Sequence, residues 1–215
     1  MKIIQKLVPQ SKYNVKCPYS MNAEFIVVHN TYNDAPAKNE VAYMIRNDNQ
    51  VSFHYAIDDK EIVQGIPENR NAFHAGDGRN GKGNRKGLSI EICYSKSGGQ
   101  RFINAEKLAA KFIASKLKEK KWGIDKVKKH QDFSGKYCPH RTLDMGWQRF
   151  LNMVQAELNA LKGADKVADK DKPSNWAKET WEWAKKEGIT DGTRPKEPAT
   201  REEIITMLYR FKEVK

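Results

Sequence analysis

The chain has 215 residues, a formal net charge of +12 and a sequence isoelectric point near 9.5. It lacks any apolar run approaching the roughly 18 residues that a membrane-spanning helix needs, and residues 1–6 lack the apolar stretch of a signal peptide. We therefore expect synthesis in the cytoplasm, no membrane span and an anionic partner. Charge alone does not choose among nucleic acid, a membrane surface and an acidic wall polymer.

The first half of the chain predicts two strand regions and a helix. Residues 1–21 contain one short apolar cluster and are expected to lie as a strap across the domain. Residues 24–28 read as a buried strand, which places His29 at its carboxyl end, where α/β sheets usually carry their sites. Residues 38–46 have helical spacing, and residues 52–57 and 61–65 predict a hairpin turning at 58–60.

The middle of the chain predicts an exposed loop followed by a strand. Residues 76–87 contain only Gly, Asn, Lys, Arg and Asp, so we expect a solvated loop. Residues 88–94 alternate in polarity, which puts Glu91 on the opposite face from Ile90 and Ile92. If the aliphatic face meets the core, Glu91 faces a cleft.

The C-terminal half predicts helices and a separate tail. Residues 104–120 and 147–161 show amphipathic helical periodicity, and the first domain is expected to span residues 1–162. Residues 163–173 alternate Asp with Lys and read as a linker. Residues 174–215 predict a helical hairpin whose second helix opens at the capping box from Thr200 to Glu203. One face of its first helix, with Trp176, Trp183 and Ala184, is expected to meet Ile204, Leu208 and Phe211 of the second. The predicted fold class is α/β, with a central mixed β-sheet flanked by helices, plus this small C-terminal hairpin.

The positive charge belongs to the first domain. Residues 174–215 hold nine basic and eight acidic side chains, and residues 163–173 hold three of each, so residues 1–162 carry +11. The anionic partner is therefore expected to meet the first domain. The cysteines, three in number and without CxxC spacing, argue against a disulfide framework.

The segment from His130 to His140 combines metal-ligand chemistry with loop punctuation. It contains an imidazole at His130, a thiol at Cys138 and a cation at Lys136, and Gly135 and Pro139 favour a loop over a helix. Zinc binds neutral imidazole and thiolate at about 2.0–2.3 Å, and a catalytic site leaves one of four positions to water. His130 and Cys138 could supply two ligands, and His29 is the best candidate for the third.

These motifs, taken in order, resemble a known family. His29 after a buried strand, the pair Phe53-His54, the run Phe-His-Ala-Gly at 73–76, the strand around Glu91 and the loop at 130–140 resemble the zinc-dependent N-acetylmuramoyl-L-alanine amidases, the type that includes phage T7 lysozyme and peptidoglycan recognition proteins. The resemblance covers roughly residues 20–162 and is strongest to amidase endolysins of phages that infect Gram-positive bacteria and to prophage autolysins. The tail resembles a single S-layer homology motif, although such motifs usually come in threes.

The resemblance implies a function and roles for individual residues. It implies peptidoglycan hydrolysis at the amide between N-acetylmuramic acid and L-alanine, with Zn²⁺ bound by His29, His130 and Cys138. Glu91 would be the general base and then acid, and Lys136 would stabilise the oxyanion. Of the remaining histidines, His54 and His140 would bind substrate or orient a ligand, and His74 would be structural or line the substrate site. Some members carry a tyrosine where this chain has Phe53, so proton transfer here would fall on Glu91.

The sequence is also compatible with several alternatives. Glu91 could be a structural ion-pair partner and Lys136 a solvated surface lysine. The whole domain could be a noncatalytic peptidoglycan-binding module, although such members typically lose the cysteine ligand that Cys138 supplies here. A nucleic-acid binder is disfavoured because the basic residues form no patch interleaved with aromatics. The tail could bind anionic wall polymer or pair with another copy as a homo-oligomer, and the protein is expected to reach the cell wall on release at lysis.

Overall fold

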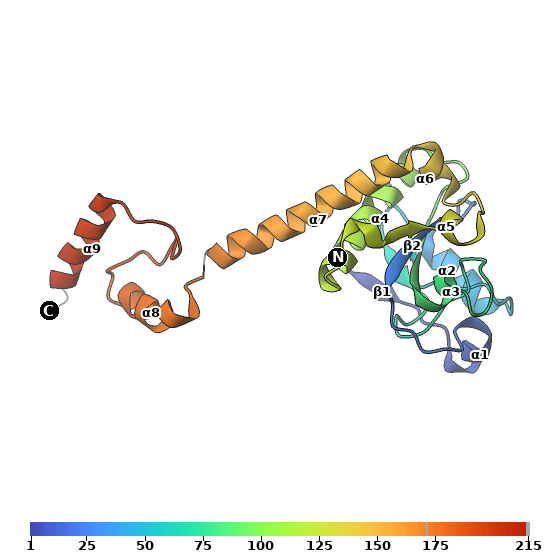
Figure 1. Ribbon diagram of the computed structural model, residues 1–215, viewed down its shortest axis with the longest axis horizontal. Coiled ribbons are helices and arrows are strands. Elements are labelled where there is room, and N and C mark those ends of the chain that lie inside the picture. The colour runs from blue at the N-terminus through green and yellow to red at the C-terminus, as the bar shows by residue number, and fades with distance from the viewer. Residues whose placement is uncertain (171, 214–215) are drawn as a thin grey trace. The chain divides into compact units, whose positions relative to one another are not determined.

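The computed structural model describes residues 1–170 and 172–213, without the side chains of residues 165–170. The chain divides into two compact units, Met1–Asn159 and Ala160–Lys215 (Figure 1). Among the described residues, none of the helices is both long and apolar enough to cross a membrane.

The first unit is built on a mixed six-stranded sheet, which confirms the predicted fold class. Its order is β1-β4-β3-β5-β2-β6; β3 and β4 pair antiparallel, and the other neighbouring strands pair parallel. The strands are β1 (Ile3–Gln5), β2 (Phe25–Asn30), β3 (Tyr55–Ile57), β4 (Ile62–Gln64), β5 (Gly87–Ile92) and β6 (Val127–Lys129). The expected buried strand is β2, every residue of which is buried, and the expected hairpin is β3–β4.

Helices cover both faces of the sheet. The α-helices of this unit are α1 (Tyr13–Lys16), α2 (Ala37–Arg46), α3 (Lys82–Lys86), α4 (Gly99–Glu119), α5 (Gln131–Ser134), α6 (His140–Asp144) and the first part of α7 (Trp147–Lys170), with 3-10 turns at Gln10–Lys12 and Ile124–Lys126. Tyr55 of β3 packs on Phe112 of α4, with ring centroids 4.7 Å apart. On the other face, Gly65 after β4 lies against Met44 of α2. The alternation of strand side chains therefore leaves α2 and α4 on opposite faces.

Three stretches differ from the sequence-based expectation. The predicted strap at residues 1–21 adds strand β1 to the sheet edge, beside β4. The predicted loop at 76–87 contains helix α3, because the Asp77 carboxylate accepts the backbone N–H groups of Gly83 (2.6 Å) and Asn84 (3.3 Å). Helix α7 does not end near Lys162 but continues to Lys170, through much of the stretch predicted as linker; Asp171 lies outside the described residues.

The second unit contains a 3-10 turn at Asn175–Ala177, helix α8 (Lys178–Lys186) and helix α9 (Arg201–Glu213). The predicted capping box is confirmed: Glu203 N–H donates to Thr200 Oγ1 at 3.1 Å, and Thr200 N–H donates to Glu203 Oε2 at 2.8 Å. The Trp183 and Phe211 rings lie 6.1 Å apart between centroids. The rest of the expected apolar contact is weak, because Trp176 and Leu208 are 87% and 63% exposed.

Candidate functional site

The centre of the sheet places His29 beside Glu91. These two residues are direct partners in the parallel pairing of β2 and β5, so their side chains leave the sheet on the same face. Nδ1 of His29 lies 4.0 Å from Oε1 of Glu91. That face also carries Ala56, the partner of Glu91 on β3, and it is the face covered by α2. Glu91 also lines the cavity described below, which confirms that it faces a cleft.

The segment after β6 brings His130 and Cys138 to the same place. Because β6 pairs with β2, His130 follows β6 close to the end of β2, and its N–H donates to the Val28 carbonyl at 3.3 Å. Helix α5 then ends at Gly135, whose φ of +76° lies in the left-handed region that glycine adopts most easily. The returning chain is held by a 3.0 Å bond from Gln131 N–H to the Cys138 carbonyl.

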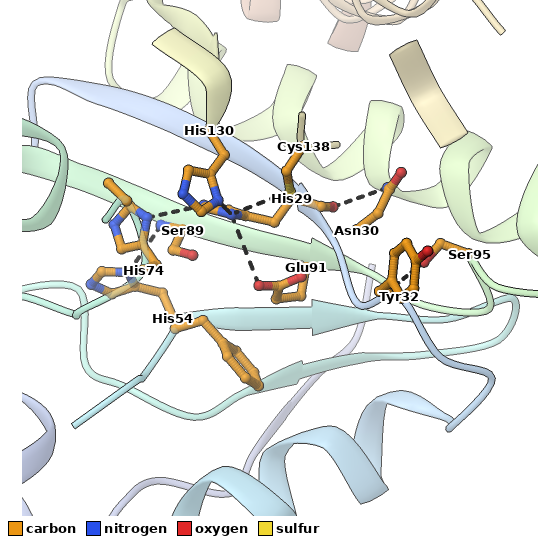
Figure 2. A network of polar contacts seen from close by, with 12 residues as sticks. His29, Asn30, Tyr32, His54, His74, Ser89, Glu91, Ser95, His130 and Cys138 are labelled. Carbon is orange, nitrogen blue, oxygen red and sulfur yellow. Dashed lines mark hydrogen bonds and ion pairs between the residues drawn. The ribbon is translucent and has the colours of Figure 1, made fainter. Parts of the chain in front are cut away.

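Three donor atoms converge as a metal site requires. Nδ1 of His29 lies 3.0 Å from Nδ1 of His130 and 3.9 Å from Sγ of Cys138, and the three ligand atoms all lie within 4.8 Å of one another. Adjacent ligand atoms of a tetrahedral zinc site with bonds of about 2.0–2.3 Å lie about 3.3–3.6 Å apart. The observed spacings bracket these values (Figure 2). Two imidazoles with one thiol form a donor set that suits zinc and would leave a fourth position to water.

The surroundings keep the two imidazoles neutral, as metal ligands must be. Burial, with the charges of neighbouring His74, His130 and Lys136, holds the pKa of His29 well below its usual value. Burial and the Lys136 charge lower the pKa of His130 to about 4. Burial and the charge of Glu91 raise the pKa of the Cys138 thiol to about 12, although a hydrogen bond from the Asn30 backbone opposes the shift. A metal ion that binds Cys138 would therefore have to displace the thiol proton.

His74 contacts His29 through Nε2, the ring nitrogen opposite the one that lies near His130. Nε2 of His29 is 2.9 Å from Nδ1 of His74, and the two rings meet edge to face with centroids 5.0 Å apart (Figure 2). If Nδ1 of His29 holds a metal, Nε2 carries the ring proton and donates a hydrogen bond to Nδ1 of His74. His74 is itself held by its backbone N–H, which donates to Oδ1 of Asn84 at 2.7 Å. This arrangement fixes both the tautomer and the ring orientation of His29.

His54 and His140 occupy different surroundings. His54 is fully buried; its Nδ1 accepts the Ser89 N–H at 3.0 Å and its Nε2 donates to the Arg70 carbonyl at 2.9 Å. His140 lies 3.2 Å from the Ser95 carbonyl through Nε2 and packs its ring on Tyr32, with centroids 4.6 Å apart. Neither histidine is among the residues that line the cavity described next, whereas His74 is.

A cavity of about 780 Å³ opens over the donor cluster. At one end it is lined by His29, His130, Cys138, Glu91 and the exposed Lys136, so the structure brings the predicted ligands and the predicted catalytic residues together. Burial, together with the charge of Glu40 on α2, raises the pKa of Glu91 to about 8, although Lys136 opposes the shift.

The other wall of the cavity was not foreseen from the sequence. It is formed by α2 and the turn after it, and its lining residues include Tyr43, Arg46, Asn47, Asn49 and Val51. Asn30 was missed as well: its side chain accepts the Arg141 N–H at 3.0 Å and donates to the His29 carbonyl at 3.1 Å, tying the end of β2 to α6. Its position directly after His29 was the signal that could have found it.

Fold and site together define an α/β protein in which a buried His-His-Cys cluster that could hold a metal ion lies beside a carboxylate, in a cavity. Comparison with known proteins identifies it further: residues 19–141 match the N-acetylmuramoyl-L-alanine amidase family, and this chain belongs to that family.

Relatives and solved structures agree with this assignment. The N-acetylmuramoyl-L-alanine amidase CwlA of Bacillus subtilis (strain 168) is 49% identical over 215 residues, which cover 98% of this chain and 78% of that protein. The amidase XlyB of the same organism is 56% identical over 76% of this chain and 52% of its own length. The structure of PlyL superposes with a TM-score of 0.70 at 55% identity, covering 72% of this chain and 97% of that one.

Proposed function

We propose that this chain is a zinc-dependent peptidoglycan hydrolase that cleaves the amide between N-acetylmuramic acid and L-alanine. The observation that carries the proposal is the convergence of His29, His130 and Cys138, with donor atoms within 4.8 Å of one another, beside the Glu91 carboxylate in one cavity. Membership of the amidase family supports the choice of substrate and bond.

Glu91 is the group that moves the proton. When bound, zinc would polarise the scissile carbonyl and lower the pKa of the attacking water. Glu91 accepts the proton of that water and passes it to the departing amine. Its pKa, raised to about 8 by burial and by the neighbouring charge of Glu40, suits a group that takes up and releases a proton near neutral pH. Phe53 lines the same cavity without a hydroxyl, so the transfer rests on Glu91.

Lys136 and His74 complete the proposed site. Lys136 lines the cavity two residues before Cys138, and its ammonium group stabilises the negative charge that develops on the carbonyl oxygen. His74 acts through His29, by accepting the hydrogen bond that orients the ligand ring. Substrate contact by His54 and His140 stays a prediction. Neither histidine lines the cavity; His54 is enclosed by backbone partners, and the His140 ring packs on Tyr32.

The place of action is the cell wall. The net charge of +11 on residues 1–162 would hold the domain on a wall rich in anionic polymers. We infer that the protein is encoded by a phage or prophage and that its biological role is bacterial lysis. The S-layer-homology-like unit would add wall binding or pairing with another copy. Pelleting of the full chain with purified wall, compared with a Trp176→Ala variant and followed by light scattering, distinguishes these two roles.

Metal removal tests the proposed chemistry. The protein is treated with a chelator, zinc is added back, and new L-alanine amino ends are counted on purified wall. We expect activity to disappear with the metal and to return with it. Activity indifferent to the metal would contradict the proposal, and wall binding without any new amino ends would instead indicate a noncatalytic recognition module.

A further inference from the structure

Two lysines of the N-terminal segment reach the cavity wall from outside the matched family region. They are Lys12, at the end of the 3-10 turn Gln10–Lys12, and Lys16, the last residue of α1; the family match begins only at residue 19. Lys16 has no exposed surface, although it carries a charged group. Burying an ammonium group costs free energy unless each of its N–H donors has an acceptor. The hydrogen-bond partners of Lys16 therefore indicate its structural role.

The partners of Lys16 all lie on the turn that follows α2. Its Nζ donates to Oδ1 of Asn47 at 2.9 Å, to the Val51 carbonyl at 3.2 Å and to the Asn49 carbonyl. These three acceptors match the three donors of an ammonium group. The contact is held from the other side as well, because the Ser52 hydroxyl donates to the Lys16 carbonyl at 2.6 Å. The Lys16 side chain thus holds three residues of the turn at 47–51 through hydrogen bonds from one ammonium group.

Lys12 holds the end of the helix that precedes this turn. Its Nζ donates to the carbonyls of Ile45 (2.9 Å) and Arg46 (3.0 Å), and it forms an ion pair with Asp48 at 2.9 Å. The last carbonyls of a helix lack intrahelical partners and carry partial negative charge, so a lysine there is stabilising. The two lysines together fix the chain from residue 45 to residue 51.

That stretch also forms part of the cavity wall. Arg46, Asn47, Asn49 and Val51 line the same cavity as His29, and none of them belongs to the donor cluster of His29, His130 and Cys138. With the scissile amide at the metal end, this wall meets a part of the substrate remote from the reacting bond. The stem peptide is the part of peptidoglycan that carries free carboxylates beyond the first alanine, and Arg46 presents an exposed guanidinium to it.

We propose that Lys12 and Lys16 are positioning residues, which hold the α2 wall in the shape that binds the stem peptide beyond L-alanine. The inference rests on the proposed amidase function. Contacts to remote parts of a substrate contribute fully to binding only if the protein surface is already ordered. If the turn were loose, the entropy cost of ordering it on binding would offset the free energy of those contacts.

Paired substrates and paired variants test this role. Lys16→Met keeps the length of the side chain and removes its donors, and Lys12→Met does the same at a site that is already part-exposed. Each is assayed for kcat and KM on an N-acetylmuramoyl dipeptide and an N-acetylmuramoyl pentapeptide, with zinc content and hydrogen exchange of residues 45–51 measured in parallel. Lys6→Met is the matched control, since this exposed lysine makes no side-chain hydrogen bond or ion pair with the described residues.

We expect KM for the pentapeptide to rise about tenfold more than KM for the dipeptide, with zinc retained and faster exchange at residues 45–51. The control should match the wild type. Equal losses on both substrates, or no change in either KM, would overturn the inference. If Lys16→Met fails to fold, Lys12→Met decides by the same criteria. A wild-type protein that cleaves neither substrate would instead contradict the proposed function, so the two failures are distinguishable.

Discussion

The two units of the chain differ in how their apolar side chains are placed. In the unit Met1–Asn159, β2 is wholly buried and Phe102, Phe112 and Phe150 have at most 1% of their surface exposed. In the unit Ala160–Lys215, Ile205 and Leu208 are 66% and 63% exposed. Close packing of the first kind fixes side chains in single positions, as a catalytic site requires.

This difference indicates that the first unit carries the reactive groups, whereas the second unit is held mainly by local hydrogen bonds. The first unit holds titratable groups in buried, strongly perturbed surroundings, such as Glu91 with its pKa of about 8. The second relies on short-range devices, such as the capping box at Thr200. Substitutions should therefore have large functional effects in the first unit and small, local ones in the second.

Glu91→Gln is expected to have the largest effect. The amide keeps the size of the side chain but cannot accept the proton of the attacking water, so kcat should fall by about 10²–10⁴. Zinc content should stay at the wild-type level, because the proposed ligands are untouched. Cleavage of muropeptides and metal content by atomic absorption check both parts. A fully active variant would remove Glu91 from the mechanism.

His74→Gln should act on the metal rather than on the proton transfer. It removes the ring that pairs with Nε2 of His29 at 2.9 Å and loosens the tautomer of that ligand. Loss of such an outer contact typically lowers metal affinity by about 10- to 100-fold. The rate of zinc transfer to a chromogenic chelator measures it, with Tyr43→Phe, in the same cavity but on α2, as the control. Unchanged zinc retention would reduce His74 to a packing role.

The metal end of the cavity could be predicted because its signals are local. His29 follows an apolar strand, and His130 and Cys138 flank a loop marked by Gly135 and Pro139. Residue type and position made His29 the best candidate to join His130 and Cys138, and the family resemblance implied the same three residues, whose ligand atoms the structure brings within 4.8 Å of one another. The ligand and catalytic roles of these residues stay predictions until metal and activity are measured.

The α2 wall could not be predicted because its determinants are distant in sequence. Lys16 reads as one more lysine of a polar segment, yet it is buried by contacts to a turn more than 30 residues away. The length of α7 was missed for a different reason. Residues 163–170 have little to bury, which suggested a linker, but alanine and lysine have high helix propensity and the helix continues through them.

The first unit should lose stability at acid pH through Glu68. Burial opposes ionisation of this carboxyl, but hydrogen bonds from Lys116 and Tyr55 and the charges of Lys116 and Lys120 outweigh it, and the pKa of Glu68 falls to about 2. Below the unfolded pKa the unfolded chain binds the proton more readily, so the stabilisation is complete above about pH 5 and is lost as the pH falls towards 2.

Comparison with Glu68→Gln isolates this contribution. We expect the difference in unfolding free energy between wild type and variant to shrink by about 2 kcal/mol from pH 6 to pH 3. Urea denaturation at each pH measures it. A difference that stays constant across this range would mean that the ion pairs with Lys116 and Lys120, at 2.8 and 3.2 Å, contribute nothing to stability.

Thr200→Ala should have the smallest effect and should be confined to the second unit. The Thr200 hydroxyl accepts the Glu203 N–H at 3.1 Å, and its loss leaves that donor to water at the start of α9. An N-cap of this kind contributes about 1 kcal/mol. Faster hydrogen exchange in the first turn of α9, with unchanged kcat and KM on a soluble muropeptide, is the expected result, and Thr193→Ala, outside the helices, is the control. A fall in kcat would show that the second unit supports the reaction itself, which would remove the division between the two units.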